Sequence, residues 1–383
     1  MSPTYSQIHL TSAWPLSRPD SHNYTMGKGL ILLTGATGFV GFAILLRALK
    51  NDHDVRIIVY SESEAEQLRS SSAICSLNKS SSYSFHVVPD PQAPDALDAA
   101  ARGAEYIIHV ASPLPFQPIE TEQLYNAVVG PAVNFTLNVL SAAKNSGSVK
   151  RVVCTSSAAA FVSPSELLGA DQETTLNKTE EDANDDVFAE PGQPIPDVMT
   201  AYLASKTAAL QRSKRWMEAY GGSGRLGFDL VNVAPTYVFG RHEAAKNVEE
   251  LLSKSNALIL GMVVPKERMG AAPTLTDAEV SSGVHVDNVV DCHLMALDRT
   301  KIPGGETFLL STDPVWNDVP MWTRQIFPQE VEDGLLTCHG RCETKKVRFV
   351  PDKAKKAFGI EFKGVDAIVR DVVGQYLELV KRS

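Results

Sequence analysis

The chain has 383 residues, of which 44% are apolar, and it carries a formal net charge of -9 at pH 7. This length can bury a large core and allows either two domains or one large domain with a substrate lobe. The acidic balance argues against a nucleic-acid partner, and the longest apolar runs fall far short of the roughly 20 residues that a membrane helix needs.

Cellular location and metal content can also be predicted from composition. Residues 1–27 lack a positively charged segment followed by an apolar one, so we expect a flexible tail and no secretory signal. The five cysteines are scattered through a long chain, which favours reduced thiols and a cytoplasmic protein. Cys338 and Cys342 flank His339, but no second ligand pair has zinc-finger spacing, so we expect no metal site.

The most informative stretch is TGATGFVG, residues 34–41, which follows the aliphatic run LILL and precedes a helical pattern at 39–49. The aliphatic run predicts a buried parallel strand, because four consecutive apolar residues hide both faces of a sheet. We expect Gly35 to permit a tight turn, Gly38 to let the backbone approach a pyrophosphate, and Gly41 to let the helix pack closely on the strand. The helix N-terminus would offer free N–H groups to the same pyrophosphate.

The second predicted strand, VRIIVY, ends where dinucleotide-binding folds meet the adenosine ribose. An acidic side chain there accepts a hydrogen bond from the 2′-hydroxyl of NAD, whereas an arginine favours the 2′-phosphate of NADP. Tyr60, Glu62 and Arg69 match neither pattern, because Arg69 could reach a phosphate that Glu62 would repel. Asp90, after a third strand at 85–88, is either a contact for the adenine amino group or a solvated loop residue.

Two later strands should deliver polar residues to the carboxyl edge of the sheet, where ligands of open α/β sheets collect. The strand at 106–110 leads into Ala111, Ser112 and Pro113, and the strand at 149–155 leads into Ser156 and Ser157. One long helix is predicted between them, at 120–145, from its apolar spacing. The acidic, proline-rich segment 164–197 predicts a surface loop that roofs a substrate cleft.

The segment YLASK places Tyr202 and Lys206 four residues apart, on one face of a predicted helix. A phenol is a poor proton donor or acceptor near neutral pH, but an adjacent ammonium favours the phenolate. We therefore expect Lys206 to lower the pKa of Tyr202 while Tyr202 transfers a proton. Such a pair also occurs by chance on surface helices, so its weight comes from the upstream serines and the glycine turn.

The rest of the chain continues the alternation of strands and helices. We expect strands at 228–233 and 306–310, a helix within 281–297 whose N-cap is Asp287, and a mixed helical end in which Trp316, Trp322 and Phe327 pack. The division expected is a tail at 1–27, a dinucleotide-binding domain at 28–238 with strands returning at 283–311, and a substrate lobe at 239–282 and 312–383. His109, His285 and His293 are expected to be buried or capping residues.

These motifs resemble the extended short-chain dehydrogenase/reductases of the NAD-dependent epimerase/dehydratase superfamily, within them the group of dihydroflavonol, cinnamoyl and aldehyde or methylglyoxal reductases. The residues that carry the resemblance are TGATGFVG, HVASP at 109–113, CTSSAAA at 154–160, YLASK at 202–206 and APTYVFG at 234–240. The resemblance implies a Rossmann-type doubly wound parallel sheet with a smaller substrate lobe. It slightly favours NADP(H) and leaves NAD(H) open, since Tyr60 stands where relatives usually carry arginine.

The resemblance also implies residue roles. Ser157, with Ser156 as the close alternative, would polarise a carbonyl, Tyr202 would donate the proton, and Lys206 would bind the nicotinamide ribose. Pro235 is expected to break the sheet ladder so that backbone lines the nicotinamide pocket. The full set of expected coenzyme contacts is Gly35, Thr37, Gly38, Phe39, Val40, Gly41, Tyr60, Asp90, Ala111, Ser112, Pro113, Tyr202, Lys206, Pro235 and Val238.

The function predicted from these residues is an NAD(P)H-dependent carbonyl reductase acting on a flavonoid-, polyketide- or small-aldehyde-like ketone or aldehyde. Its partner would be a small-molecule carbonyl compound, and the chain would be a monomer or homodimer. One alternative is a nucleotide-sugar epimerase of the same superfamily; dehydration is disfavoured because Thr155 is followed by two serines and not by an acid. The other is a non-catalytic dinucleotide sensor, although sensors tend to lose the tyrosine and lysine that this chain keeps.

Overall fold

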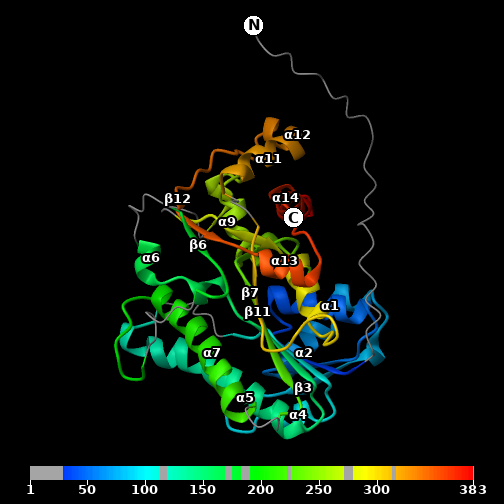
Figure 1. Ribbon diagram of the computed structural model, residues 1–383. Coiled ribbons are helices and arrows are strands. Elements are labelled where there is room, and N and C mark those ends of the chain that lie inside the picture. Colours follow the sequence, from blue (N-terminus) through cyan, green and yellow to red (C-terminus); the bar gives the residue numbers. More distant parts are fainter. Residues whose placement is uncertain are drawn as a thin grey trace.

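The computed structural model describes residues 29–112, 119–168, 175–182, 190–221, 226–270, 279–312 and 316–382, so the expected tail lies outside it. Seven strands form one parallel sheet: β1 Ile31–Thr34, β2 Val55–Val59, β3 Tyr83–Val87, β4 Tyr106–His109, β5 Arg151–Thr155, β7 Asp229–Pro235 and β11 Thr307–Leu310. Their order is β11-β7-β5-β4-β1-β2-β3 (Figure 1). The chain reverses direction across the sheet between β1 and β4, which is the switch point where such sheets bind ligands. The predicted Rossmann-type fold is confirmed.

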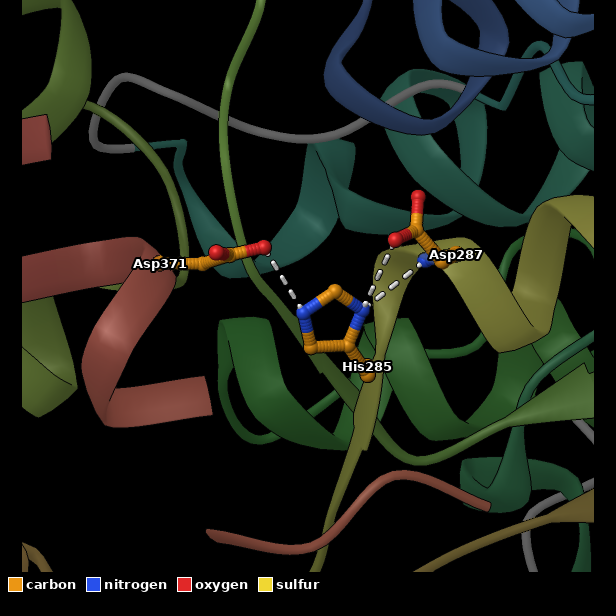
Figure 2. A group of neighbouring side chains, drawn as sticks. All are labelled: His285, Asp287 and Asp371. Atoms are coloured by element: carbon orange, nitrogen blue, oxygen red, sulfur yellow. Dashed lines mark hydrogen bonds and ion pairs between the residues drawn. The ribbon is translucent and has the colours of Figure 1, made fainter. Parts of the chain in front are cut away.

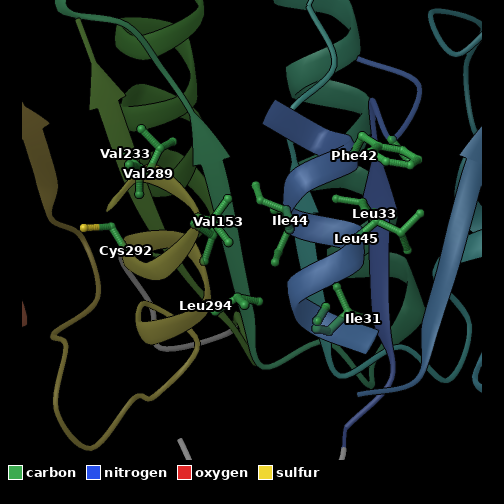
Figure 3. Close-up of a cluster of buried hydrophobic side chains, with 14 of the residues drawn as sticks. Ile31, Leu33, Phe42, Ile44, Leu45, Val153, Val233, Val289, Cys292 and Leu294 are labelled. Atoms are coloured by element: carbon green, nitrogen blue, oxygen red, sulfur yellow. The ribbon is translucent and has the colours of Figure 1, made fainter. Parts of the chain in front are cut away.

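Helices cover both faces of the sheet. One face carries α1 Phe39–Lys50, α2 Glu62–Arg69 and α10 Val286–Met295, and the other carries α4 Asp98–Ala101, α5 Gly130–Ser146 and α7 Val198–Gly221. Ile31 and Leu33 of β1 pack with Ile44 and Leu45 of α1 (Figure 3), whereas Leu32 faces the opposite layer. The aliphatic run therefore buries both its faces, as predicted for a central parallel strand.

A second buried cluster belongs to the later part of the chain and lies at the top of Figure 1. Its helices are α8 Val248–Leu252, α9 Asn256–Leu260, α11 Val319–Ile326, α12 Pro328–Glu332 and α14 Val365–Val380. Trp316 is fully buried in this cluster, and Trp322 and Phe327 are partly buried against the cluster, as expected. Helix α13 Asp352–Phe358 packs on β11, where the ring centres of Phe358 and Phe308 lie 4.8 Å apart. Three short parallel pairs lie outside the main sheet: β8 Tyr237–Phe239 with β10 Gly283–His285, β9 Glu279–Val280 with β12 Thr344–Lys345, and β6 Leu176–Lys178 with β13 Val347–Phe349.

The long helical segment expected at 120–145 is present, but it is not α-helical throughout. A short 3-10 turn is followed by a π-helical turn, Tyr125–Val129, and only then by α5. Pro131 lies in the first turn of α5. Proline has no N–H and cannot donate to the preceding turn, so the π turn accommodates it without breaking the helical path, which stays right-handed at Val129 and Gly130.

Two further expectations about loops need correction. Pro235 does not break the ladder: it is the last residue of β7, pairs with Leu310, and is followed by a hydrogen bond from the Thr236 N–H to the Leu310 carbonyl at 3.0 Å. The segment 164–197 is not only a surface loop, since it contains α6 Pro164–Leu168 and β6. Within it, the buried Glu180 accepts the Leu309 N–H of β11 at 2.7 Å, which satisfies the outer edge of the sheet.

A charged joint connects α14 to the start of α10 (Figure 2). The N-cap of α10 is His285 and not the predicted Asp287: its Nδ1 accepts the Asp287 N–H at 3.1 Å. Nε2 lies on the other side of the ring, 3.0 Å from the carboxylate of Asp371 in α14, to which it donates. Lys363 lies 2.6 Å and Arg47 3.3 Å from the Asp287 carboxylate. Burial raises the pKa of Asp287, but the neighbouring His285, Lys363 and Arg47 together lower it by more, to about 2.

The same three side chains have the residue types of a metal site, with ligand atoms within 4.8 Å of one another. Their polar atoms already serve the helix cap and the ion pairs, so the group acts as a structural joint. Buried His285, like buried His109 and His293, is a capping or packing residue, as expected.

Candidate active site

The turn after β1 has the backbone that its glycines were expected to provide. Gly35 has a φ of +80°, in the left-handed region, and a Cβ there would lie 2.7 Å from the Ala111 nitrogen. A Cβ on Gly41 would lie 2.0 Å from the Gly35 carbonyl oxygen, so only glycine lets α1 approach the turn this closely. These two glycines are therefore required by the fold itself.

Gly38 is different, because the chain does not need a glycine there. Its backbone is extended, and an added Cβ would meet nothing nearer than the Gly35 oxygen at 3.4 Å. Gly38 is also the N-cap of α1, whose first turn has neither a side-chain cap nor an acidic residue. Uncapped N–H groups beside open space suit an anionic ligand such as a pyrophosphate. The residues present thus fit the expected dinucleotide.

Three polar side chains predicted to act together meet at the carboxyl edge of the sheet. The Ser157 hydroxyl lies 3.3 Å from the Tyr202 hydroxyl, although β5 and α7 bring them from distant parts of the chain. One helical turn further on, the Lys206 ammonium lies 5.5 Å from the centre of the Tyr202 ring and donates to the Ser112 hydroxyl at 2.9 Å. Ser112 directly follows β4, so the lysine connects two strand ends.

The position of Ser157 leaves its proton available. Ser157 is the N-cap of the short 3-10 turn Ala158–Phe161, and its oxygen accepts the Ala159 N–H at 3.2 Å. A hydroxyl whose oxygen accepts from the backbone can still donate outward. Ser156 is placed differently: its hydroxyl is buried without a hydrogen-bond partner and lines a cavity of about 30 Å³, shared with Lys206 and His109.

The expected effect of Lys206 on the Tyr202 pKa is wrong. Burial raises the pKa of the Tyr202 phenol above its ordinary value, and the hydrogen bond from Ser157 opposes that rise only in part. Burial lowers the pKa of Lys206 to about 8. Lys206 therefore stays protonated at neutral pH and places its ammonium on Ser112, while Tyr202 stays a neutral phenol.

Thr34 holds the residues after β4 in place beside the site, a positioning role that sequence reasoning missed. Its hydroxyl oxygen accepts the N–H groups of Val110 and Ala111, both at 3.2 Å, and lies 2.8 Å from His109 Nδ1. With both lone pairs occupied, the hydroxyl donates to His109, which fixes the ring tautomer. Burial, with the charge of Lys206, lowers the pKa of His109 to about 3, so the ring is neutral. In the sequence, the only indication of this role is that Thr34 is the first residue of TGATGFVG.

The carboxyl edge of the sheet, which we call the rim, is more exposed at its opposite end, after β2 and β3. Tyr60 has 43% of its surface exposed and follows the last residue of β2. Asp90 is exposed, and its carboxylate accepts the Gln92 N–H at 2.9 Å, as a loop-capping aspartate does. Neither residue approaches the Ser157 cluster through a recorded hydrogen bond, and their coenzyme roles stay predictions.

The other predicted contacts follow the strand ends. Phe39 packs edge-on against His242 with ring centres 5.0 Å apart, and Thr37 is exposed in the turn. Val40 and Val238 are half-buried against the main core, and Pro235 is buried. Pro113 lies outside the described residues.

This fold, with a glycine turn at the switch point and a Ser, Tyr and Lys cluster beside it, defines a dinucleotide-binding protein of the Rossmann class. The model of the NAD dependent epimerase/dehydratase family matches residues 31–310, and the chain belongs to that family. The predicted resemblance is thereby confirmed.

Curated relatives match over nearly their whole lengths. The ketoreductase CTB6 of Cercospora beticola is 35% identical over 371 residues, covering 94% of this chain and 98% of the relative. The NAD-dependent epimerase/dehydratase ALT6 of Alternaria alternata is 31% identical, covering 92% and 99%. Among solved structures, the NADPH complex of the yeast methylglyoxal/isovaleraldehyde reductase Gre2 superposes with a TM-score of 0.72, 24% identity and coverage of 92% and 100%.

The chain is an NAD(P)-dependent oxidoreductase, as its sequence predicts. A nicotinamide dinucleotide as coenzyme is supported by the family, and the choice between NADP(H) and NAD(H) stays a prediction. Within the described residues, no helix has the length and apolar character needed to cross a membrane.

Proposed function

We propose that this chain reduces the carbonyl group of a small-molecule ketone to an alcohol. The observation that carries the proposal is the contact between the Ser157 and Tyr202 hydroxyls, 3.3 Å apart, on the rim shared with the glycine turn. A carbonyl oxygen placed between two hydroxyl donors would be polarised by one and protonated by the other. The relatives described as ketoreductases favour a ketone over an aldehyde.

The coenzyme, when bound, supplies the hydride, and the chain supplies positions and protons. Ser157 would hold the carbonyl oxygen, because its own oxygen is held by the Ala159 N–H. Tyr202 would donate the proton; its raised pKa keeps the phenol protonated, which is the form that a reductase needs. Lys206 would bind the nicotinamide ribose from its place beside Ser112.

Ser157, and not Ser156, is the serine we assign to the carbonyl. Ser157 reaches Tyr202, whereas the Ser156 hydroxyl lines the cavity next to Lys206. The proposal thus chooses between two adjacent serines that the sequence alone leaves open.

The substrate we propose has an apolar body, such as an aromatic or polyketide-like ketone. Val198 and Met199 begin α7, four and three residues before Tyr202, and so lie on the same face of the helix. They are 38% and 52% exposed, so their apolar side chains are available to a ligand at the start of α7. An apolar substrate would cover them on its way to Tyr202.

The test follows a deuterium label from C4 of the reduced coenzyme during turnover of purified protein with a panel of ketones. We expect deuterium on the carbinol carbon of the product and stoichiometric coenzyme oxidation. Substrate turnover without net coenzyme oxidation, on nucleotide sugars, would instead identify the epimerase alternative. Coenzyme binding without turnover of any compound would favour the sensor.

A further inference from the structure

The end of β2 selects between the two nicotinamide coenzymes in dinucleotide-binding folds, because the adenosine ribose lies there. In this chain β2 runs beside β1 with Thr34 opposite Ile58, so its last residues are adjacent to the glycine turn. Tyr60 follows the strand and Ser61 is the N-cap of α2. These residues therefore occupy the position that reads the ribose 2′-substituent.

A carboxylate is held at this point by one hydrogen bond to its oxygen, as part of a Ser-x-x-Glu capping box at the start of α2. The Tyr60 N–H donates to the Glu64 carboxylate at 2.7 Å, and the Glu64 N–H donates to the Ser61 hydroxyl at 3.3 Å. Glu64 is in the first turn of α2 and is half-buried, yet its carboxylate folds back to the strand end. One backbone donor uses only part of the acceptor capacity of a carboxylate, which can still accept from a ribose hydroxyl.

The cations of the same segment have other partners. Residues 55–69, all of them described, contain two arginines. Arg56 donates to the backbone carbonyls of Ala100 and Arg102 at 2.6 and 2.7 Å. Arg69 pairs with Glu66 and lies over the Phe85 ring, 5.1 Å from its centre. Neither has its charge directed to the Tyr60 backbone, where the carboxylate of Glu64 lies.

We propose that Glu64 makes this chain prefer NADH to NADPH, in contrast to the NADPH-bound solved neighbour. The inference rests on the proposed function. A fixed carboxylate accepts a hydrogen bond from the 2′-hydroxyl of NADH, but it repels the 2′-phosphate of NADPH, which carries up to two negative charges. Sequence reasoning weighed Glu62 and missed Glu64, because the backward fold of the Glu64 side chain appears only in the structure.

The experiment measures the dissociation constants of NADH and NADPH by titrating coenzyme fluorescence, without substrate. For the wild type we expect NADH to bind about tenfold more tightly at low salt, the scale of one charge repulsion near a surface, with a gap that narrows as salt is added. Glu64→Gln keeps an oxygen for the Tyr60 N–H but loses the charge, so NADPH affinity should rise about tenfold. Glu66→Gln makes the same charge change on the same helix, at a carboxylate that pairs with Arg69, and should shift the ratio far less.

The results that overturn the inference are separate from those that overturn the function. Wild-type protein that binds NADPH as tightly as NADH, or an unchanged ratio in Glu64→Gln, would remove Glu64 from coenzyme selection while leaving the reductase intact. A folded wild-type protein that binds neither coenzyme would overturn the proposed function, and this inference with it.

Discussion

The two ends of the sheet rim are built in opposite ways. At one end, Ser157, Tyr202 and Lys206 are half-buried and connected to one another or to a neighbouring strand end by hydrogen bonds. At the other, Tyr60 and Asp90 are exposed, and their bonds stay within their own loops. At the first end, burial shifts the pKa values of Tyr202 and Lys206. At the second end, we propose that surface charges such as Glu64 select the coenzyme, and such charges can change at little cost to the fold.

The largest effect within this comparison is expected from the serine pair. Ser157→Ala removes the hydroxyl that contacts Tyr202, and turnover should fall by about 10²-fold, the scale of one lost oxyanion donor. Ser156→Ala is the matched control: it deletes a buried hydroxyl without a partner, so turnover and thermal stability should change little. Equal losses in the two variants would contradict the assignment of Ser157.

A smaller effect concerns the pH dependence of turnover. Since burial lowers the pKa of Lys206 to about 8, the lysine is charged below that pH and neutral above it. Tyr202, with its pKa raised, stays protonated throughout this range. We therefore expect kcat/KM to fall as pH rises through about 8, approaching tenfold per unit. The arginine of Lys206→Arg stays charged, so the kcat/KM of this variant should not change around pH 8, whatever its absolute rate. The same fall in Lys206→Arg would mean that a group other than Lys206 titrates.

The parts of the molecule that could be predicted from sequence are those set by local pattern. The run LILL, the turn glycines and the spacing of Tyr202 and Lys206 each specify their element within a few residues, and the Rossmann sheet follows from them. The three-residue strand Val347–Phe349 could not be predicted, because it pairs with β6 from a distant part of the chain and has no period of its own.

Electrostatic properties of the site were the least predictable. The direction of the Tyr202 pKa depends on burial by several elements, which the spacing of two residues does not contain. The cap of α10 is a similar case, since His285 takes the place of Asp287 because Asp371 of α14 holds its ring from the other side. Helix capping by an aspartate is a local rule, and a tertiary contact overrides it here.

The central claim is that Tyr202 donates the proton from its position beside Ser157. The most direct test measures both the turnover and the coenzyme affinity of Tyr202→Phe. The ring and its packing are kept, so the account predicts an unchanged coenzyme dissociation constant and a turnover lower by about 10²- to 10⁴-fold, the range for a lost general acid. Wild-type turnover in Tyr202→Phe would contradict the account.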